Sequence, residues 1–173
     1  MSISLYDVSV TSFLQTLGAV SGFLGKGREH CDQNGIDLDS IVEARLVGDM
    51  LPFRFQIVSV AHHSLGAIRA VESGVFSPPV ASPDLDYAAL ESLVADARSQ
   101  LKQCDRETID ALEGNDVQFK LGERVMPFIA RDFVQSFSLP NFYFHATTAY
   151  DILRVQGAPI GKRDFIGIPR IKA

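Results

Sequence analysis

The sequence predicts an all-α protein, an antiparallel four-helix bundle with one small β-hairpin between its third and fourth helices. Two observations predict this class: long segments whose apolar residues recur every three or four positions, and short connections between these segments. One short segment alternates as a hairpin does, and no glycine-rich strand-to-helix turn of a doubly wound α/β fold is present. With 173 residues, we expect a single domain over residues 1–173.

The first long helix is predicted over residues 10–33, where the apolar positions follow helical spacing. Gly35, after Asn34, supplies a left-handed stop. Gly18 and Gly22 lie four residues apart, and this spacing would allow close approach of a neighbouring helix.

A short helical turn over about residues 40–45 leads to the second long helix. We expect that helix to start with Asp49 as its N-cap, to hold Pro52 in its first turn and to end at Gly74. Its core stripe is predicted to be Phe53, Ile57, Val60, Ala61, Leu65 or Ser64, Ile68 and Val71.

The proline-rich stretch 77–83 is interpreted as an exposed linker between helices. Ser82 and Pro83 form a plausible N-cap and first helical position for the third helix, which is expected to end near Cys104. A further short helix is expected over residues 105–112.

The hairpin is predicted over residues 117–129, with its turn at Gly122 and with Pro127 confining its strand to an edge. The fourth long helix is predicted over residues 130–156. Pro140 lies inside it and should kink it or split it in two.

The charge balance excludes a nucleic-acid footprint. There are 16 Lys and Arg against 21 Asp and Glu, a net charge of −5, and no basic block to meet phosphates. Cys31 and Cys104 have neither disulfide-framework nor zinc-site spacing. The N-terminus lacks the pattern of a secretory signal and no segment reads as a membrane span, so we expect a cytoplasmic protein with no membrane partner.

Two polar strips stand out on the second and fourth helices. They consist of Gln56, Ser59 and His63, at positions i, i+3 and i+7, and of Asn141, His145 and Thr148, at positions i, i+4 and i+7. If the strips face each other, His63 and His145 meet inside the bundle or at its mouth. His62 points about 100° away from His63 in a regular helix. Which of the two faces the site stays open, with His63 nearer the apolar stripe.

These residues allow more than one kind of site. Catalytic zinc usually takes three protein ligands, and the amide of Asn141 is a weak ligand for zinc or nickel. The strips are therefore compatible with a metal site, with a small-ligand site involving Gln56, Ser59, Asn141 and Thr148, or with a buried hydrogen-bonded network.

A family resemblance is carried by three segments: SLYDVSV at residues 4–10, LPNFYFHATTAYDILR at residues 139–154 and GKRDF at residues 161–165. Together they resemble a bacterial family of uncharacterised proteins within the DinB/YfiT-like metalloenzyme superfamily. The resemblance implies a cytoplasmic four-helix bundle that forms a homodimer. It also implies a divalent metal, nickel or zinc, held by His63 and by a pair on the fourth helix at which Asn141 and His145 stand, with Asn141 in place of the usual His.

Two functions follow as hypotheses. The first is a DinB-like bundle with a divalent-metal or small-ligand site between the second and fourth helices, in which a metal activates a thiol or water as in thiol-dependent transferases. An enzyme of this kind would be a metal-assisted transferase or hydrolase. The second is a non-catalytic dimeric bundle that binds a small apolar ligand or a protein partner through the aromatic residues of the fourth helix.

Overall fold

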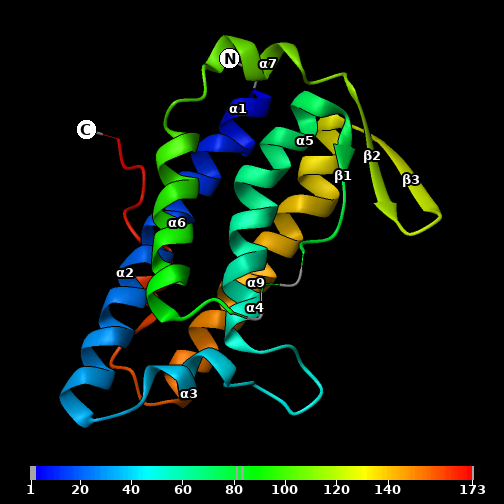
Figure 1. Ribbon diagram of the computed structural model, residues 1–173. Helices are drawn as coiled ribbons and strands as arrows, with labels where there is room; N and C mark the ends of the chain where they lie inside the picture. The colour runs from blue at the N-terminus through cyan, green and yellow to red at the C-terminus, as the bar shows by residue number, and fades with distance from the viewer. Residues whose placement is uncertain (1–2, 81, 83, 173) are drawn as a thin grey trace.

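The computed structural model describes residues 3–80, 82 and 84–172, which form mostly helices with a small three-stranded sheet at one end (Figure 1). The helices are α1 (Leu5–Val8), α2 (Val10–Asn34), α3 (Leu38–Glu43), α4 (Phe53–Ala61), α5 (Ala67–Ser73), α6 (Tyr87–Leu101), α7 (Arg106–Ala111), α8 (Ala130–Asp132), α9 (Leu139–Val155) and α10 (Lys162–Ile166). Two π-helical segments, η1 (His62–Gly66) and η2 (Phe133–Ser138), and three strands, β1 (Val75–Phe76), β2 (Asp116–Leu121) and β3 (Arg124–Ile129), complete the fold.

Helix α2 follows the predicted first helix closely and ends at Gly35, whose φ of 62° is left-handed. The close approach falls elsewhere than at the predicted pair. A Cβ on Gly18 would meet only the Arg98 guanidinium at ordinary contact distance, and one on Gly22 would meet nothing within 4 Å. At Gly27 a Cβ would lie 2.6 Å from the hydroxyl of Tyr87, so Gly27 is where a neighbouring helix needs a glycine.

The second long helix begins later than predicted. Asp49 lies in a turn rather than at an N-cap, and α4 starts at Phe53 with Pro52 in the N-cap position. Pro52 has the extended backbone of a residue outside the helix, with ψ of 169°, and the amide of Phe53 donates to the carbonyl of Ala44 at 2.8 Å. This bond closes the loop after α3 and fixes the start of α4.

The second helix is not regular along its length. Between α4 and α5, the segment η1 makes a π-helical turn, which widens the helix locally. The buried hydroxyl of Ser64 donates to the carbonyls of Val60 and Ala61, at 2.7 and 3.1 Å. Gly74, at φ of 80°, then ends α5 as predicted.

Helix α6 starts at Tyr87 with Asp86 as its N-cap, where the Asp86 carboxylate accepts from the amide of Ala89. The predicted N-cap at Ser82 is therefore wrong, and Pro83 lies outside the described residues. Figure 1 shows α6 running in the same direction as α4 and α5, because the connection from β1 returns along the length of the molecule. These consecutive helices are thus parallel, whereas short connections had predicted antiparallel neighbours.

The hairpin forms as predicted from β2 and β3, with Pro127 on the edge strand β3. A third strand, β1, pairs in parallel with β2 and was not predicted. It is two residues long, too short to show alternation. Its Phe76 is buried and lies against the aromatic residues of η2.

The fourth long helix is divided at the predicted place. Segment η2 precedes Pro140, which stands in the first turn of α9. Proline has no N–H to complete a helical hydrogen bond. The Asn141 side chain, one residue later, donates to the carbonyl of Phe137 at 2.7 Å, and the π-helical segment η2 ends directly before α9.

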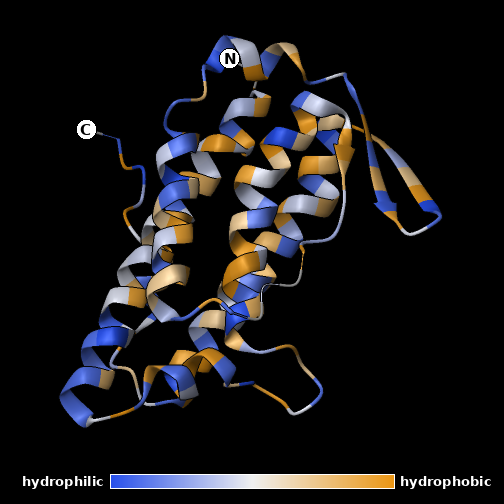
Figure 2. Cartoon of the chain, in the orientation of Figure 1, coloured by the Kyte–Doolittle hydropathy of each residue, from blue (hydrophilic) through white to orange (hydrophobic). Residues whose placement is uncertain are grey.

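Apolar residues concentrate on the inner faces of the long helices (Figure 2). By length and composition, the helical stretch Leu5–Asn34 would suffice to cross a membrane, which corrects the expectation that no segment would. Half of its most apolar window is buried inside the fold. The core helix of a soluble protein meets the same criterion, and this stretch is weak evidence for a membrane.

Candidate functional site

The two polar strips do meet between α4–η1 and α9. The imidazoles of His63 and His145 lie with ring centroids 5.8 Å apart and planes 18° apart. His63 is 6% exposed and His145 is partly buried. The contact between α4 and α9 is extensive, so rigid helices position both rings.

Gln56 sets the tautomer of His145. Its amide nitrogen donates to the carbonyl of Leu51 at 2.8 Å, which orients the amide, and its Oε1 lies 2.8 Å from Nδ1 of His145. Because an amide oxygen only accepts hydrogen bonds, Nδ1 of His145 carries the proton. Nε2 of His145 is then left with a free lone pair.

His63 is held from the other side by the fourth helix. The buried hydroxyl of Ser138, in η2, donates to the backbone carbonyl of His63 at 2.7 Å. The two π-helical segments are thus joined at this point. Nδ1 of His63 is buried without a hydrogen-bond partner among the described residues. This imidazole therefore also has a ring nitrogen that is available to a ligand.

Aromatic rings surround both imidazoles and remove them from water. Phe76 and Phe137 lie beside His63, with centroids at 5.3 and 5.9 Å, and Phe55 and Phe144 lie beside His145, at 5.8 and 5.2 Å. Burial, aided by the neighbouring His62 and His145, lowers the pKa of His63 to about 3. Burial lowers the pKa of His145 to about 4. Both rings are therefore neutral near pH 7.

The other predicted residues take different places. Ser59 is buried and its hydroxyl has no hydrogen-bond partner within the described part of the chain. Thr148 donates to the carbonyl of Phe144, one turn back in its own helix, at 2.8 Å. Asn141 likewise turns back, toward Phe137. The structure brings together Gln56, His63 and His145. The side chains of Asn141 and Thr148 instead each donate a hydrogen bond to the backbone carbonyl four residues earlier.

His62 points away from this cluster, although it contacts His63 at a centroid distance of 5.5 Å. Its Nε2 lies 2.7 Å from the carbonyl of Ser77, in the connection after β1. His63 is therefore the histidine of the pair that faces the fourth helix.

The donor set can be tested against a divalent metal. Two neutral imidazoles 5.8 Å apart are close enough for one ion at about 2.1 Å from a nitrogen of each. Over residues 3–80, 82 and 84–172, however, no group of three or more His, Cys, Asp or Glu side chains is placed to hold a metal. The described residues therefore supply two imidazole ligands at most, and they do not fit a resident three-ligand centre.

Sequence reasoning missed two contributors to the site. Ser138 orients His63 through the backbone, and Phe76 reaches it from the unpredicted strand β1. Pro140 was the sequence feature that could have pointed to Ser138, because a break in the fourth helix was expected beside this proline. No comparable signal marks Phe76.

The fold defines the structural class of the protein. A crystal structure of a DinB family member protein from Shewanella denitrificans is similar to this chain, with a TM-score of 0.81, 22% sequence identity, and coverage of 98% of this chain and 95% of that chain. At this identity the likeness shows the fold alone. The protein has a DinB-like, mostly helical fold.

The family can be stated more closely. Residues 5–166 match the domain of unknown function DUF1993, and the chain belongs to this family. No curated protein matches the chain. The expected DinB-like fold and domain of unknown function are confirmed, whereas bacterial origin, cytoplasmic location, the homodimer and metal-dependent chemistry remain predictions.

Proposed function

We propose that this protein binds a divalent transition-metal ion, nickel or zinc, reversibly between His63 and His145. The observation that carries the proposal is the pair of hydrogen bonds of the Gln56 side chain, one to the carbonyl of Leu51 and one to Nδ1 of His145. These bonds orient the imidazole of His145 and leave its Nε2 unprotonated. A metal-binding histidine needs this arrangement, because the ligand nitrogen must carry a lone pair.

The depressed pKa values support the same proposal. A histidine that is protonated at neutral pH must lose a proton before it binds a metal. His63 and His145, with pKa values of about 3 and about 4, need no such step. When bound, the ion would supply Lewis-acid chemistry, lowering the pKa of a thiol or water in its open positions, as expected of a metal-assisted transferase or hydrolase.

Metal titration tests the proposal directly. We expect about one equivalent of nickel or zinc to bind per chain, measured by titration calorimetry and elemental analysis, and His63→Ala and His145→Ala each to weaken binding by at least about tenfold. His30→Ala is the matched control, because His30 lies at the far end of α2 beside Asn34. Less than about a tenth of an equivalent after metal loading, or unchanged binding in both variants, would overturn the proposal.

A specific observation favours the second candidate function, a dimeric bundle that binds through its fourth helix. Phe144 and Tyr143 are adjacent on α9 and are 54% and 40% exposed. Exposed aromatic side chains in a cluster are typical of interaction surfaces. In this alternative, His63, Gln56 and His145 form a structural network that stiffens the surface, and the titration gives no saturable metal binding.

A further inference from the structure

A second set of polar groups lies on the other side of the second helix, away from the His63–His145 pair. Helices α4, η1 and α5 form one wall of a cleft of about 360 Å³, and α6 forms the other. The cleft has the usual composition of a small-molecule site, mainly apolar with a few polar groups, at the small end of the size range. The parallel run of the two walls (Figure 1) sets the order of residues along it.

The apolar part of the cleft lies toward the start of both helical columns. Val58 and Ala61 line it from α4, Leu93 lines it from α6, and Leu85 lines it from the connection before α6. Toward the other end, the lining becomes polar, with Arg69 on α5 and Asp96 and Gln100 on α6. A molecule in this cleft would therefore meet apolar surface at one end and charge at the other.

His62 contributes a directed acceptor to the same cleft. Its Nε2 lies 2.7 Å from the carbonyl of Ser77, and a carbonyl only accepts, so Nε2 carries the proton and Nδ1 has the lone pair. A Cβ at position 66 would lie 3.3 Å from this Nδ1. Gly66 thus keeps the acceptor uncovered on the cleft side.

The two charges of the cleft do not pair with each other. The Arg69 guanidinium donates to the amide oxygen of Gln100 at 2.7 Å, and within the described part of the chain neither Arg69 nor Asp96 takes part in an ion pair. Arg69 retains donors for a carboxylate, since a guanidinium has five N–H groups. Asp96 and Nδ1 of His62 are acceptors suited to an ammonium group.

We propose that this cleft binds a small zwitterion, an α-amino acid with an apolar side chain. The carboxylate pairs with Arg69, the ammonium donates to Asp96 and to Nδ1 of His62, and the side chain lies on Val58, Ala61 and Leu93. Arg69 and Asp96 are both exposed, so a ligand with only one of the two charges forms one ion pair fewer and binds more weakly.

The experiment is a titration of the full, EDTA-treated protein with L-leucine, followed by amide chemical shifts and by calorimetry. Removal of metal separates this site from the His63–His145 pair, which an amino acid could reach through a bound ion. Two probes lack one charge each: 4-methylpentanoate has no ammonium, and 3-methylbutylamine has no carboxylate. We expect L-leucine to bind saturably, with shifts concentrated in η1 and α6, and each probe to bind about tenfold more weakly.

Substitutions locate the site. Arg69→Gln and Asp96→Asn are each expected to weaken L-leucine binding about tenfold, and Gly66→Ala to weaken it by covering Nδ1 of His62. Arg124→Gln and Asp116→Asn, which change the same charges on the exposed hairpin, should leave binding unchanged. His63→Ala should also leave it unchanged, which keeps this result distinct from that of the metal titration.

Three outcomes would overturn the proposal. One is the absence of saturable binding at concentrations well above a Kd of about 1 mM. Another is equal affinity for L-leucine and 4-methylpentanoate, which would make the cleft a carboxylate site. The third is unchanged binding in both Arg69→Gln and Asp96→Asn.

Discussion

The orientation of a single amide decides what His145 can do. Gln56 is 2% exposed and uses both ends of its side chain, one on the carbonyl of Leu51 and the other on Nδ1 of His145. Were the amide reversed, its nitrogen would face the proton on Nδ1 of His145, and its oxygen would face the carbonyl of Leu51. The carbonyl of Leu51 prevents this reversal, because it can only accept a hydrogen bond.

Replacement of Gln56 tests this role. Gln56→Leu keeps much of the volume but leaves the carbonyl of Leu51 and the N–H of His145 without partners. We expect a loss of about 1–3 kcal/mol in the free energy of unfolding, measured by urea denaturation. Nitrogen NMR should show that His145 no longer holds its proton on Nδ1 alone. Gln33→Leu, at an exposed site near the end of α2, should change neither quantity. A His145 tautomer unaffected by Gln56→Leu would contradict the role of Gln56 in setting that tautomer.

The buried imidazoles also predict a pH dependence of stability. The pKa values of His63 and His145 are lowered to about 3 and about 4 from an ordinary value of 6.5, and burial lowers the pKa of His62 as well. At pH values between the lowered pKa values and 6.5, the unfolded chain binds more protons than the folded chain. Stability is therefore full above pH 6.5 and is lost as the pH falls toward 4. Each proton contributes a slope of up to about 1.4 kcal/mol per pH unit.

The measurement is urea denaturation between pH 7 and pH 4.5. Asp7, Asp105 and Asp164 have pKa values lowered from 3.8, chiefly by hydrogen bonds, and their contribution is lost only below this window. His145→Gln should reduce the slope, and His30→Gln should not. A stability independent of pH over this range would show that the imidazoles are hydrated in the folded protein.

At the scale of elements, regular helices were predictable and their irregular turns were not. Apolar spacing and the stop at Gly35 located α2 nearly to its ends. Apolar spacing also found α6, but this helix starts at Tyr87 rather than after Ser82 and ends at Leu101 rather than near Cys104. The π-helical segments depend on contacts between distant residues, such as Ser138 with His63. The start of α4 depends on the bond from Phe53 to Ala44, which no local pattern reveals.

The same distinction applies to the site. Helical spacing was enough to place Gln56, His63 and His145 on facing strips, and these three do meet. It could not show that Asn141 turns back toward Phe137. The side chain of Asn141 has a carbonyl of its own helix within reach, and this local hydrogen bond competes with contacts across the site.

The contact at Gly27 gives a prediction at this scale. A methyl group there would lie 2.6 Å from the hydroxyl of Tyr87 and 3.1 Å from Leu153, while that hydroxyl donates to the carbonyl of Leu24 at 2.8 Å. We expect Gly27→Ala to destabilise the protein by about 1–3 kcal/mol in thermal or urea unfolding. Gly25→Ala is the control in the same helix, because nothing lies within 4 Å of its Cβ position. It should be neutral or stabilise by up to about 1 kcal/mol, and equal effects of the two substitutions would contradict the predicted overpacking.

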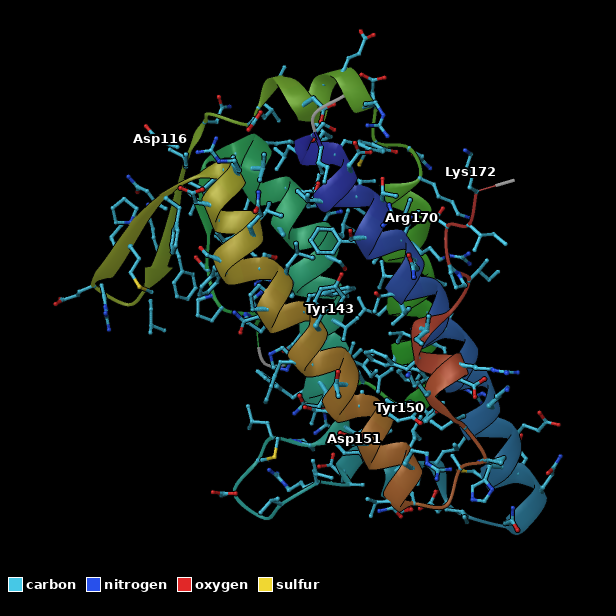
Figure 3. All side chains as sticks on the ribbon, turned by 180° about the vertical axis from the view of Figure 1, so that it is seen from behind. Asp116, Tyr143, Tyr150, Asp151, Arg170 and Lys172 are labelled. Carbon is cyan, nitrogen blue, oxygen red and sulfur yellow. The ribbon has the colours of Figure 1, made fainter. Side chains whose placement is uncertain are left out.

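For the whole molecule, the outer side of α9 is notable because it exposes two adjacent aromatic side chains, Tyr143 and Phe144. Figure 3, seen from behind, shows α9 in front, with Tyr143, Tyr150 and Asp151 along it and the C-terminal segment with Arg170 and Lys172 to one side. Tyr150 contacts Phe23 and Phe165, so α2 and α10 cover that part of the helix. Tyr143 and Phe144 are more exposed, and Phe144 also contacts His145. A partner on this surface would therefore lie next to the candidate site.

The homodimer is accordingly predicted to form through Tyr143 and Phe144. We expect the protein to be a dimer by light scattering after size-exclusion chromatography, and Phe144→Ser to raise the dimer Kd at least about tenfold, because buried aromatic side chains carry much of the energy of such interfaces. Leu121→Ser is the control, since Leu121 is 51% exposed at the end of β2 in the hairpin. A wild-type monomer at about 50 μM, above the micromolar Kd of a moderately stable dimer, would contradict the prediction. If the protein binds nickel or zinc as well as forming this dimer, weaker metal binding in Phe144→Ser would show that the interface and the metal site are coupled through the contact between Phe144 and His145.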